Sequence, residues 1–96
     1  MKESSFQSNL KKEIKERLKG CIIMKTDPIQ YQGIPDLLIL HNDKWAMLEC
    51  KRSKNASKRN NQSYYISKID KMSFARFINP ENKEEVLNEL YKALGS

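Results

Sequence analysis

Histidine and cysteine are scarce in this sequence, and their scarcity limits the metals that it can bind. The chain has one histidine, His41, and two cysteines, Cys21 and Cys50, which lie far apart. Structural zinc sites use four closely spaced Cys and His ligands, so we expect no zinc site. Both cysteines stand inside apolar runs, and we interpret them as reduced core residues of a cytosolic protein.

Long apolar runs are also missing. No run approaches the ~20 residues that a membrane-spanning helix needs, and the first residues lack the apolar core and cleavage site of a signal peptide. We therefore expect no membrane partner and a cytoplasmic location. The 96 residues predict one domain, residues 1–96, which buries only about 60 to 65% of the surface that its unfolded chain exposes. A core this thin is compatible with a homodimer.

Positive charge is what the sequence has in excess. Its 18 Lys and Arg residues against 12 Asp and Glu residues give a net charge of +6. The excess is larger than solubility requires and favours an anionic partner, with nucleic acid as the leading candidate. A different interpretation is a small interaction module, in which the apolar strands form an obligate oligomer and the charge serves only solubility.

The spacing of apolar residues predicts a first amphipathic helix over residues 4–19. Ser4 and Gln7 would form its capping box, and Gly20 would end it. Its apolar face repeats at steps of four and consists of Phe6, Leu10, Ile14 and Leu18.

Two more helices are expected later in the chain. One covers roughly residues 61–72, and the other follows an Asn82–Glu85 capping box. Their predicted apolar faces are Tyr65, Ile66, Ile69 and Met72 for the former, and Val86, Leu87, Leu90, Tyr91 and Leu94 for the latter.

Short apolar runs predict four strands, and two of them form a hairpin. The hairpin strands are apolar at nearly every position, so we expect them to be central and covered on both faces. The element order is helix, three strands, helix, strand, helix, which indicates an α/β fold with a mixed central sheet flanked by helices. The predicted strands are residues 21–25, 36–41, 45–51 and 74–78, with an irregular loop at 26–35 and a basic loop at 52–61.

Charged residues stand at the ends of the hairpin strands. Asp36 begins the first strand, and Glu49 and Lys51 end the second. In an antiparallel hairpin the start of one strand lies beside the end of the other, so the two carboxylates should meet. Glu49 and Lys51 are two residues apart and share one face, whereas the side chain of Cys50 points into the core.

Two neighbouring carboxylates repel each other unless a cation lies between them. Mg²⁺ is typically held by one or two carboxylates, a backbone carbonyl and waters, so we expect Asp36, Glu49 and the Cys50 carbonyl to bind a divalent cation next to Lys51. The alternative is that Asp36 caps a turn after Pro35 and that Glu49 and Lys51 form a surface ion pair worth about 0 to 1 kcal/mol.

These residues resemble a known nuclease signature. Pro35-Asp36, twelve intervening residues and then Glu49-Cys50-Lys51 match the PD-(D/E)XK pattern, and the stretch from Gly33 onward is similar to small phage and bacterial proteins of the VRR-NUC group. That group has a Gln after the polar loop, where this chain has Gln62. The resemblance extends over almost the whole chain.

The resemblance implies a restriction-endonuclease-like αβββαβ core and a Mg²⁺- or Mn²⁺-dependent endonuclease. Asp36, Glu49, Lys51 and Gln62 would be catalytic residues, with Gln62 orienting water or substrate; its alternative role is local hydrogen bonding at the helix start. The family also implies an acid on the first helix. Glu3 matches best, as a catalytic residue that binds the metal directly or through water, and Glu13 is the rival.

The expected substrate is DNA, branched or otherwise structured, in phage or bacterial metabolism, such as a Holliday junction or a flap. A homodimer would place two sites on a four-way junction. Whether one or two metal ions take part is left open, and a protein of the same fold that binds nucleic acid without cleaving it is the alternative. The residues expected to contact DNA around the basic loop are Arg52, Lys54, Lys58, Arg59 and Tyr64.

Overall fold

The computed structural model describes residues 2–95, so Met1 and Ser96 of the predicted domain lie outside the described part. The element order of the α/β fold is the predicted one, and the boundaries differ from the expected ones by at most a few residues. The elements are α1 (Glu3–Arg17), β1 (Ile22–Lys25), β2 (Leu37–His41), β3 (Lys44–Cys50), α2 (Asn60–Met72), β4 (Ala75–Ile78) and α3 (Lys83–Leu94).

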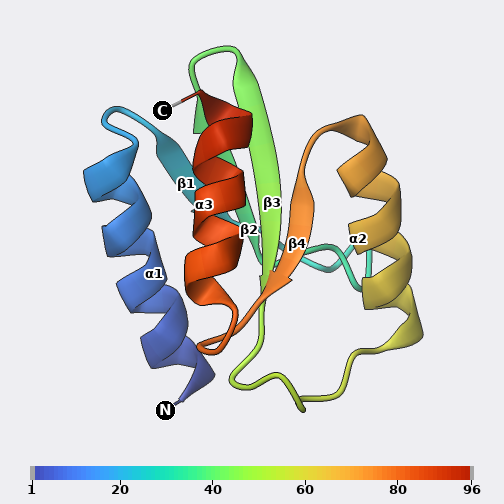
Figure 1. Cartoon of the computed structure of the whole chain (residues 1–96). Helices are drawn as coiled ribbons and strands as arrows, with labels where there is room; N and C mark the ends of the chain where they lie inside the picture. The colour runs from blue at the N-terminus through green and yellow to red at the C-terminus, as the bar shows by residue number, and fades with distance from the viewer. Residues whose placement is uncertain (1, 96) are drawn as a thin grey trace.

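A four-stranded mixed sheet forms the centre of the molecule, with strand order β1-β2-β3-β4 (Figure 1). The pairs β1–β2 and β2–β3 are antiparallel, and β3–β4 is parallel. The β2–β3 hairpin closes through Asn42 and Asp43, and Asn42 takes a positive φ of 56°, which asparagine tolerates better than most residues. The parallel pair requires a crossover, which α2 provides.

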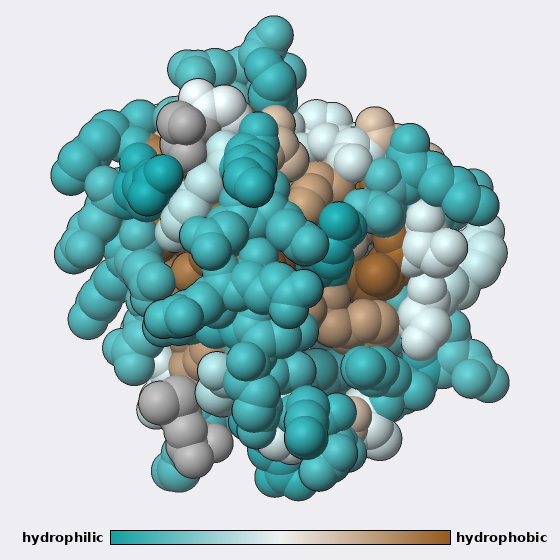
Figure 2. Space-filling view, viewed as in Figure 1, coloured by the Kyte–Doolittle hydropathy of each residue, from teal (hydrophilic) through white to brown (hydrophobic). Residues whose placement is uncertain are grey.

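Helices α1 and α3 lie on one face of the sheet, and α2 lies on the other. Alternate residues of β3 point to opposite sides, so Leu48 and Cys50 join the larger core with α1 and α3, while Met47 packs toward Ile69 of α2. The outer surface of α1 and α3 is covered mainly by hydrophilic side chains (Figure 2). Glu49 and Lys51 continue the alternation of Met47 along β3, and Asp36 lies beside Glu49 just before β2. All three residues therefore lie at the end of the α2 face.

The start of α1 differs from the prediction. Ser4 is already inside the helix, and the N-cap is Lys2, whose side chain makes no capping hydrogen bond. The predicted Ser4–Gln7 capping box is therefore wrong, because the helical backbone begins before Ser4 and Phe6 N–H bonds to the carbonyl of Lys2 at 3.1 Å. As a consequence Glu3 belongs to the first helical turn.

The predicted capping box of α3 is also wrong. Asn82 is the N-cap, but its side chain makes no capping bond. Its Oδ1 accepts a hydrogen bond from Asn79 N–H at 2.8 Å, and its Nδ2 donates to the Phe77 carbonyl at 3.2 Å. Asn82 thus closes the turn that follows β4 in place of capping the helix.

The expectation that both hairpin strands are covered on both faces is wrong for β2. Leu40 is 36% exposed, and Met72, predicted to be in the core, is 61% exposed. The reason is that α2 packs on β3 and β4 and does not reach across the sheet to β1 and the outer end of β2.

Among residues 2–95, no helix is long and apolar enough to cross a membrane.

Candidate active site

The hairpin brings Asp36 and Glu49 together at one end of the sheet. Leu37 pairs with Leu48, so the residues just beyond this pair are neighbours. The Asp36 N–H donates to Glu49 Oε1 at 3.2 Å, and the Cys50 N–H donates to Asp36 Oδ2 at 3.2 Å. Each strand end therefore holds the carboxylate of the other, as the hairpin geometry predicts.

Both carboxylates are in an environment that opposes their charge. Burial raises the pKa of Glu49 to about 7, and the neighbouring Asp36 charge acts in the same direction. Burial also raises the pKa of Asp36, with a further increase from the charge of Glu3. The nearby Lys51 amine lowers the pKa of Glu49, but by less than burial and the Asp36 charge raise it.

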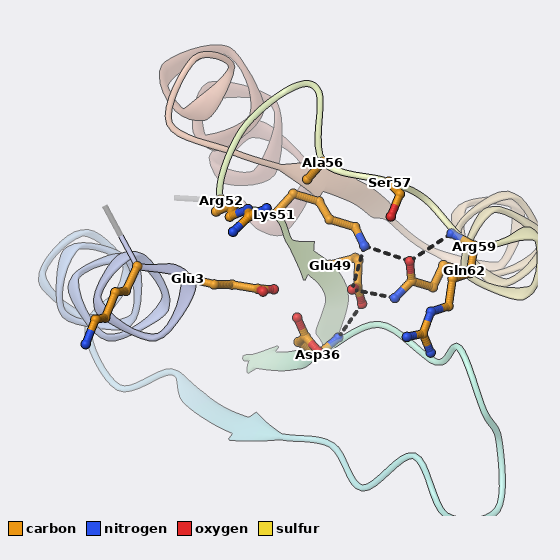
Figure 3. Close-up of a pocket in the computed structure, with 10 residues that line it drawn as sticks. Glu3, Asp36, Glu49, Lys51, Arg52, Ala56, Ser57, Arg59 and Gln62 are labelled. Carbon is orange, nitrogen blue, oxygen red and sulfur yellow. Dashed lines mark hydrogen bonds and ion pairs between the residues drawn. The ribbon is translucent and has the colours of Figure 1, made fainter.

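Lys51 and Gln62 complete a hydrogen-bonded group around Glu49 (Figure 3). Lys51 Nζ donates to Gln62 Oε1 at 2.7 Å and lies 3.7 Å from Glu49 Oε2. Gln62 Nε2 donates to Glu49 Oε2 at 3.0 Å. The first turn of α2 thus reaches back to the end of β3, as the Gln62 prediction requires.

The other roles considered for these residues fit the structure less well. Glu49 and Lys51 are only 3% and 9% exposed, so they are no surface ion pair. The Asp36 carboxylate accepts a hydrogen bond from Cys50 across the hairpin and does not cap a turn after Pro35. Gln62 does accept a local bond from Arg59 N–H at 3.2 Å, but it also contacts Lys51 and Glu49.

The first-helix acid is placed by the structure as well. Glu3 lies at the start of α1, and its carboxylate points toward Asp36 and Glu49 across the pocket in Figure 3. Glu13 lies further along α1 and forms an ion pair with Lys83 of α3 at 2.9 Å. The geometry therefore favours Glu3 over Glu13 as the acid of this site.

An open pocket of about 880 Å³ surrounds these groups. Acidic side chains line it together with basic ones, most of which are exposed. Lys2, Ala56 and Ser57 were not foreseen from the sequence, since nothing in their local pattern indicates a site. The residues that line it are Lys2, Glu3, Asp36, Glu49, Lys51, Arg52, Ala56, Ser57, Arg59 and Gln62.

The residues expected to contact DNA divide into two groups. Arg52 and Arg59 line the pocket, whereas Lys54, Lys58 and Tyr64 lie outside it. The Lys54 N–H donates to Glu81 Oε2 at 3.1 Å, which ties the basic loop to the segment after β4. Lys58 Nζ lies 5.0 Å above the Phe77 ring.

Tyr64 is 57% exposed and packs edge-on against Tyr65, with ring centroids 5.1 Å apart. Its side chain therefore offers a ring to solvent, but it does so outside the pocket. A role of Tyr64 in stacking on DNA bases stays a prediction.

The oxygen donors at this site fit a hard divalent cation. Asp36 and Glu49 supply two carboxylates, and Asp36 Oδ1 accepts no hydrogen bond from any described residue. Within residues 2–95, no three or more His, Cys, Asp or Glu side chains form a cluster that could hold a metal. A pair of carboxylates completed by waters is nevertheless a common protein share of Mg²⁺ coordination.

The Cys50 side chain is fully buried in the larger core, and burial raises its pKa to about 12. This placement confirms that the thiol points away from the pocket. The Cys50 N–H faces Asp36, and in a strand the carbonyl of a residue faces the same side as its N–H. The Cys50 carbonyl is thus directed toward Asp36, where the predicted third ligand would be.

No protein-family model, curated protein or solved structure matches this chain. Function therefore has to be inferred from the site itself.

Proposed function

We propose that this protein is a metal-dependent endonuclease that hydrolyses phosphodiester bonds in DNA. The observation that carries the proposal is the convergence of Asp36, Glu49 and Lys51 with Gln62 in one open pocket. Two acids beside an amine, in a pocket that exposed arginines also line, suit the binding and cleavage of a phosphodiester. The order of elements and the position of the site at the ends of β2 and β3 support a restriction-endonuclease-like core of the PD-(D/E)XK type.

Asp36, Glu49 and the Cys50 carbonyl would hold a Mg²⁺ or Mn²⁺ ion, with Glu3 bound to it directly or through water. Such an ion lowers the pKa of a bound water and offsets the charge that develops on the scissile phosphate. The raised pKa values of Asp36 and Glu49 support this assignment, because a cation placed between the two acids would favour their charged forms.

Lys51 would donate to a phosphate oxygen or help to position the attacking water. Its amine is already held in place, because Nζ bonds to Gln62 Oε1 at 2.7 Å and its side chain is only 11% exposed. A donor that is fixed before the substrate arrives needs little reorganisation during the reaction. Gln62 acts as a positioning residue that holds both Lys51 and Glu49.

Arg52 and Arg59 would bind the phosphates on either side of the cleaved bond. Both arginines line the pocket and are exposed, and phosphate contacts of this kind are independent of sequence and sensitive to salt. Two copies of the chain in a homodimer would present two such sites to a branched substrate.

A cleavage assay tests the proposal. The protein is incubated with end-labelled four-way junction, flap, duplex and single-stranded DNA, each with Mg²⁺, Mn²⁺ or EDTA. We expect cleavage that requires a divalent ion and is lost in Asp36→Asn but kept in Asp43→Asn, a matched change at the exposed hairpin turn. Tight binding without cleavage would instead support a non-catalytic binding protein, and neither binding nor cleavage would support an interaction module.

A further inference from the structure

A second hollow adjoins the proposed active site. It has a volume of about 450 Å³ and shares Asp36, Glu49, Arg59 and Gln62 with the first pocket. The carboxylates are therefore reached from two sides. The walls that belong to the second hollow alone come from the β1–β2 loop and the start of α2, and they are Pro28, Ile29, Gln32, Gly33, Ile34 and Asn61.

The second hollow has an apolar lip. Pro28 and Ile29 form part of its wall, and Ile29 is 82% exposed, the most exposed of the large hydrophobic residues described. Ile34, which is half-buried, packs against the smaller core and adds apolar surface deeper in the wall. Apolar surface thus extends from the solvent toward the carboxylates.

The loop that carries this lip is fixed at several points. Asp27 Oδ1 accepts a bond from Ile29 N–H at 3.1 Å, and Thr26 Oγ1 donates to the Pro35 carbonyl at 2.7 Å. On the α2 side, Asn61 Nδ2 donates to the Gln32 carbonyl at 3.1 Å. These contacts fix the backbone of the loop on both sides of Ile29.

Gly33 shows how closely the loop approaches α2. A Cβ at this position would lie 2.7 Å from Cγ of Asn61, and Gly33 has a φ of +95°. Only glycine fits this backbone and this contact without a shift. The wall of the second hollow is therefore formed by tight packing of the loop on the helix.

We infer that the second hollow takes the base of a nucleotide that flanks the scissile phosphate, in an unstacked and unpaired state. This inference rests on the proposed nuclease function. The hollow is within the size range of small-ligand sites. Among its lining residues Arg59 supplies the positive charge, and it lies on the boundary of the two pockets, where a phosphate next to the carboxylate site would lie. Pro28 and Ile29 supply an apolar surface in place of a neighbouring base.

The inference narrows the substrate class. A base inside a duplex has to leave its stack and its partner before it can enter a side pocket, and this costs least where the nucleotide is already unpaired. The protein should therefore prefer cut sites at flaps, junctions or single-stranded segments over sites within a continuous duplex.

An abasic scan tests the inference. One nucleotide at a time is replaced by an abasic residue on each side of the mapped cut in a flap substrate. We expect one flanking position at which the loss of the base slows wild-type cleavage by about tenfold or more, which is the effect of losing one buried apolar contact. Ile29→Ala should slow cleavage of the intact substrate to a similar extent and should be insensitive to the abasic residue at that position.

Ile22→Ala is the matched control, since Ile22 is 56% exposed and lies outside the hollow. It should behave as the wild type. Equal wild-type rates for every abasic substrate, or equal behaviour of Ile29→Ala and Ile22→Ala, would overturn the base-binding inference while leaving the nuclease function in place.

A binding measurement separates the two proposals if no substrate is cleaved. A fluorescent purine analogue, whose emission rises when it leaves the base stack, is placed at successive positions of a flap strand in EDTA. A rise at one position that disappears in Ile29→Ala would support the base pocket in a protein that does not cleave. No rise at any position would overturn the base pocket as well.

Discussion

The backbone amide of Asp36 donates to Oε1 of Glu49 at 3.2 Å, so the two acids are fixed side by side by the same hairpin that forms the centre of the sheet. This contact makes the acid pair a property of the fold. The pair also lowers the stability of the folded protein when both acids are ionised, because both side chains are partly removed from water and repel each other.

Stability in EDTA should fall as the pH rises. The folded-state pKa of Glu49 is raised to about 7 from its ordinary value of 4.5, and that of Asp36 is raised as well. The folded protein therefore binds protons more tightly than the unfolded chain, and this contribution is complete below the unfolded pKa and is lost as the pH rises through the folded value. We expect a loss of about 1 kcal/mol from Glu49 between pH 6 and 8.

Thermal unfolding in EDTA at the two pH values measures this loss. Asp36→Asn should reduce the difference, because it removes the neighbouring charge that raises the pKa of Glu49. Saturating Mg²⁺ should also reduce it by stabilising the ionised acids. Greater stability of the wild type at pH 8 than at pH 6 in EDTA would show that the acids are not strained in this way.

Lys51→Ala should remove most cleavage while leaving DNA binding nearly intact. The variant loses the donor that Gln62 holds in place, and the loss of one such pre-positioned donor typically lowers the rate about 100- to 1,000-fold. Single-turnover rates and binding isotherms on the same flap substrate measure the two effects. Lys44→Ala, an exposed lysine at the hairpin turn, is the control and should leave both unchanged; parallel loss of rate and binding in Lys51→Ala would point to a damaged fold.

Glu3→Gln should impair cleavage, whereas Glu13→Gln should not. Glu3 faces the acid pair, so its amide variant should lower the rate of cleavage and weaken the response to Mg²⁺. Glu13 is paired with Lys83 at 2.9 Å, so its variant should cleave normally and lose no more than about 1 kcal/mol of unfolding free energy, as for an exposed ion pair. Normal activity of Glu3→Gln together with an inactive Glu13→Gln would reverse the assignment.

Arg52→Gln and Arg59→Gln should each flatten the salt dependence of DNA binding. If each guanidinium neutralises one phosphate, each variant should reduce the slope of log affinity against log salt concentration by about 0.9. Lys71→Gln removes an exposed charge near the far end of α2 and should leave the slope unchanged. Equal slopes for all of these variants and the wild type would place DNA elsewhere on the surface.

The sequence predicts the acid pair well because the register of one short hairpin determines which two residues are neighbours. Apolar runs separated by a short turn predict a hairpin, and a hairpin of that length leaves Asp36 beside Glu49. Residues two apart on a strand share a face, so the position of Lys51 follows from that of Glu49. The proximity of Gln62 to the site is predicted by the family resemblance, together with its position one turn before Tyr65 and Ile66 on the same side of the helix.

Other features depend on contacts that periodicity does not encode. The side chains of Ser4 and Asn82 have the chemistry of helix caps, but the backbone of α1 begins earlier and Asn82 bonds within its turn. The exposure of Met72 follows from where α2 lies on the sheet. The second hollow depends on the path of the β1–β2 loop, whose sequence has no period and whose position is fixed by side chain to backbone bonds such as Asn61 to Gln32.

Direct titration of Mn²⁺ into the protein, followed by calorimetry or by the paramagnetic signal of the ion, tests the central claim that Asp36 and Glu49 hold a divalent cation. We predict saturable binding to the wild type and to Asp43→Asn, and a loss of about tenfold or more in affinity in both Asp36→Asn and Glu49→Gln, as expected when one of two charged ligands is removed. Equal affinity in all four proteins, with each variant folded, would contradict the account.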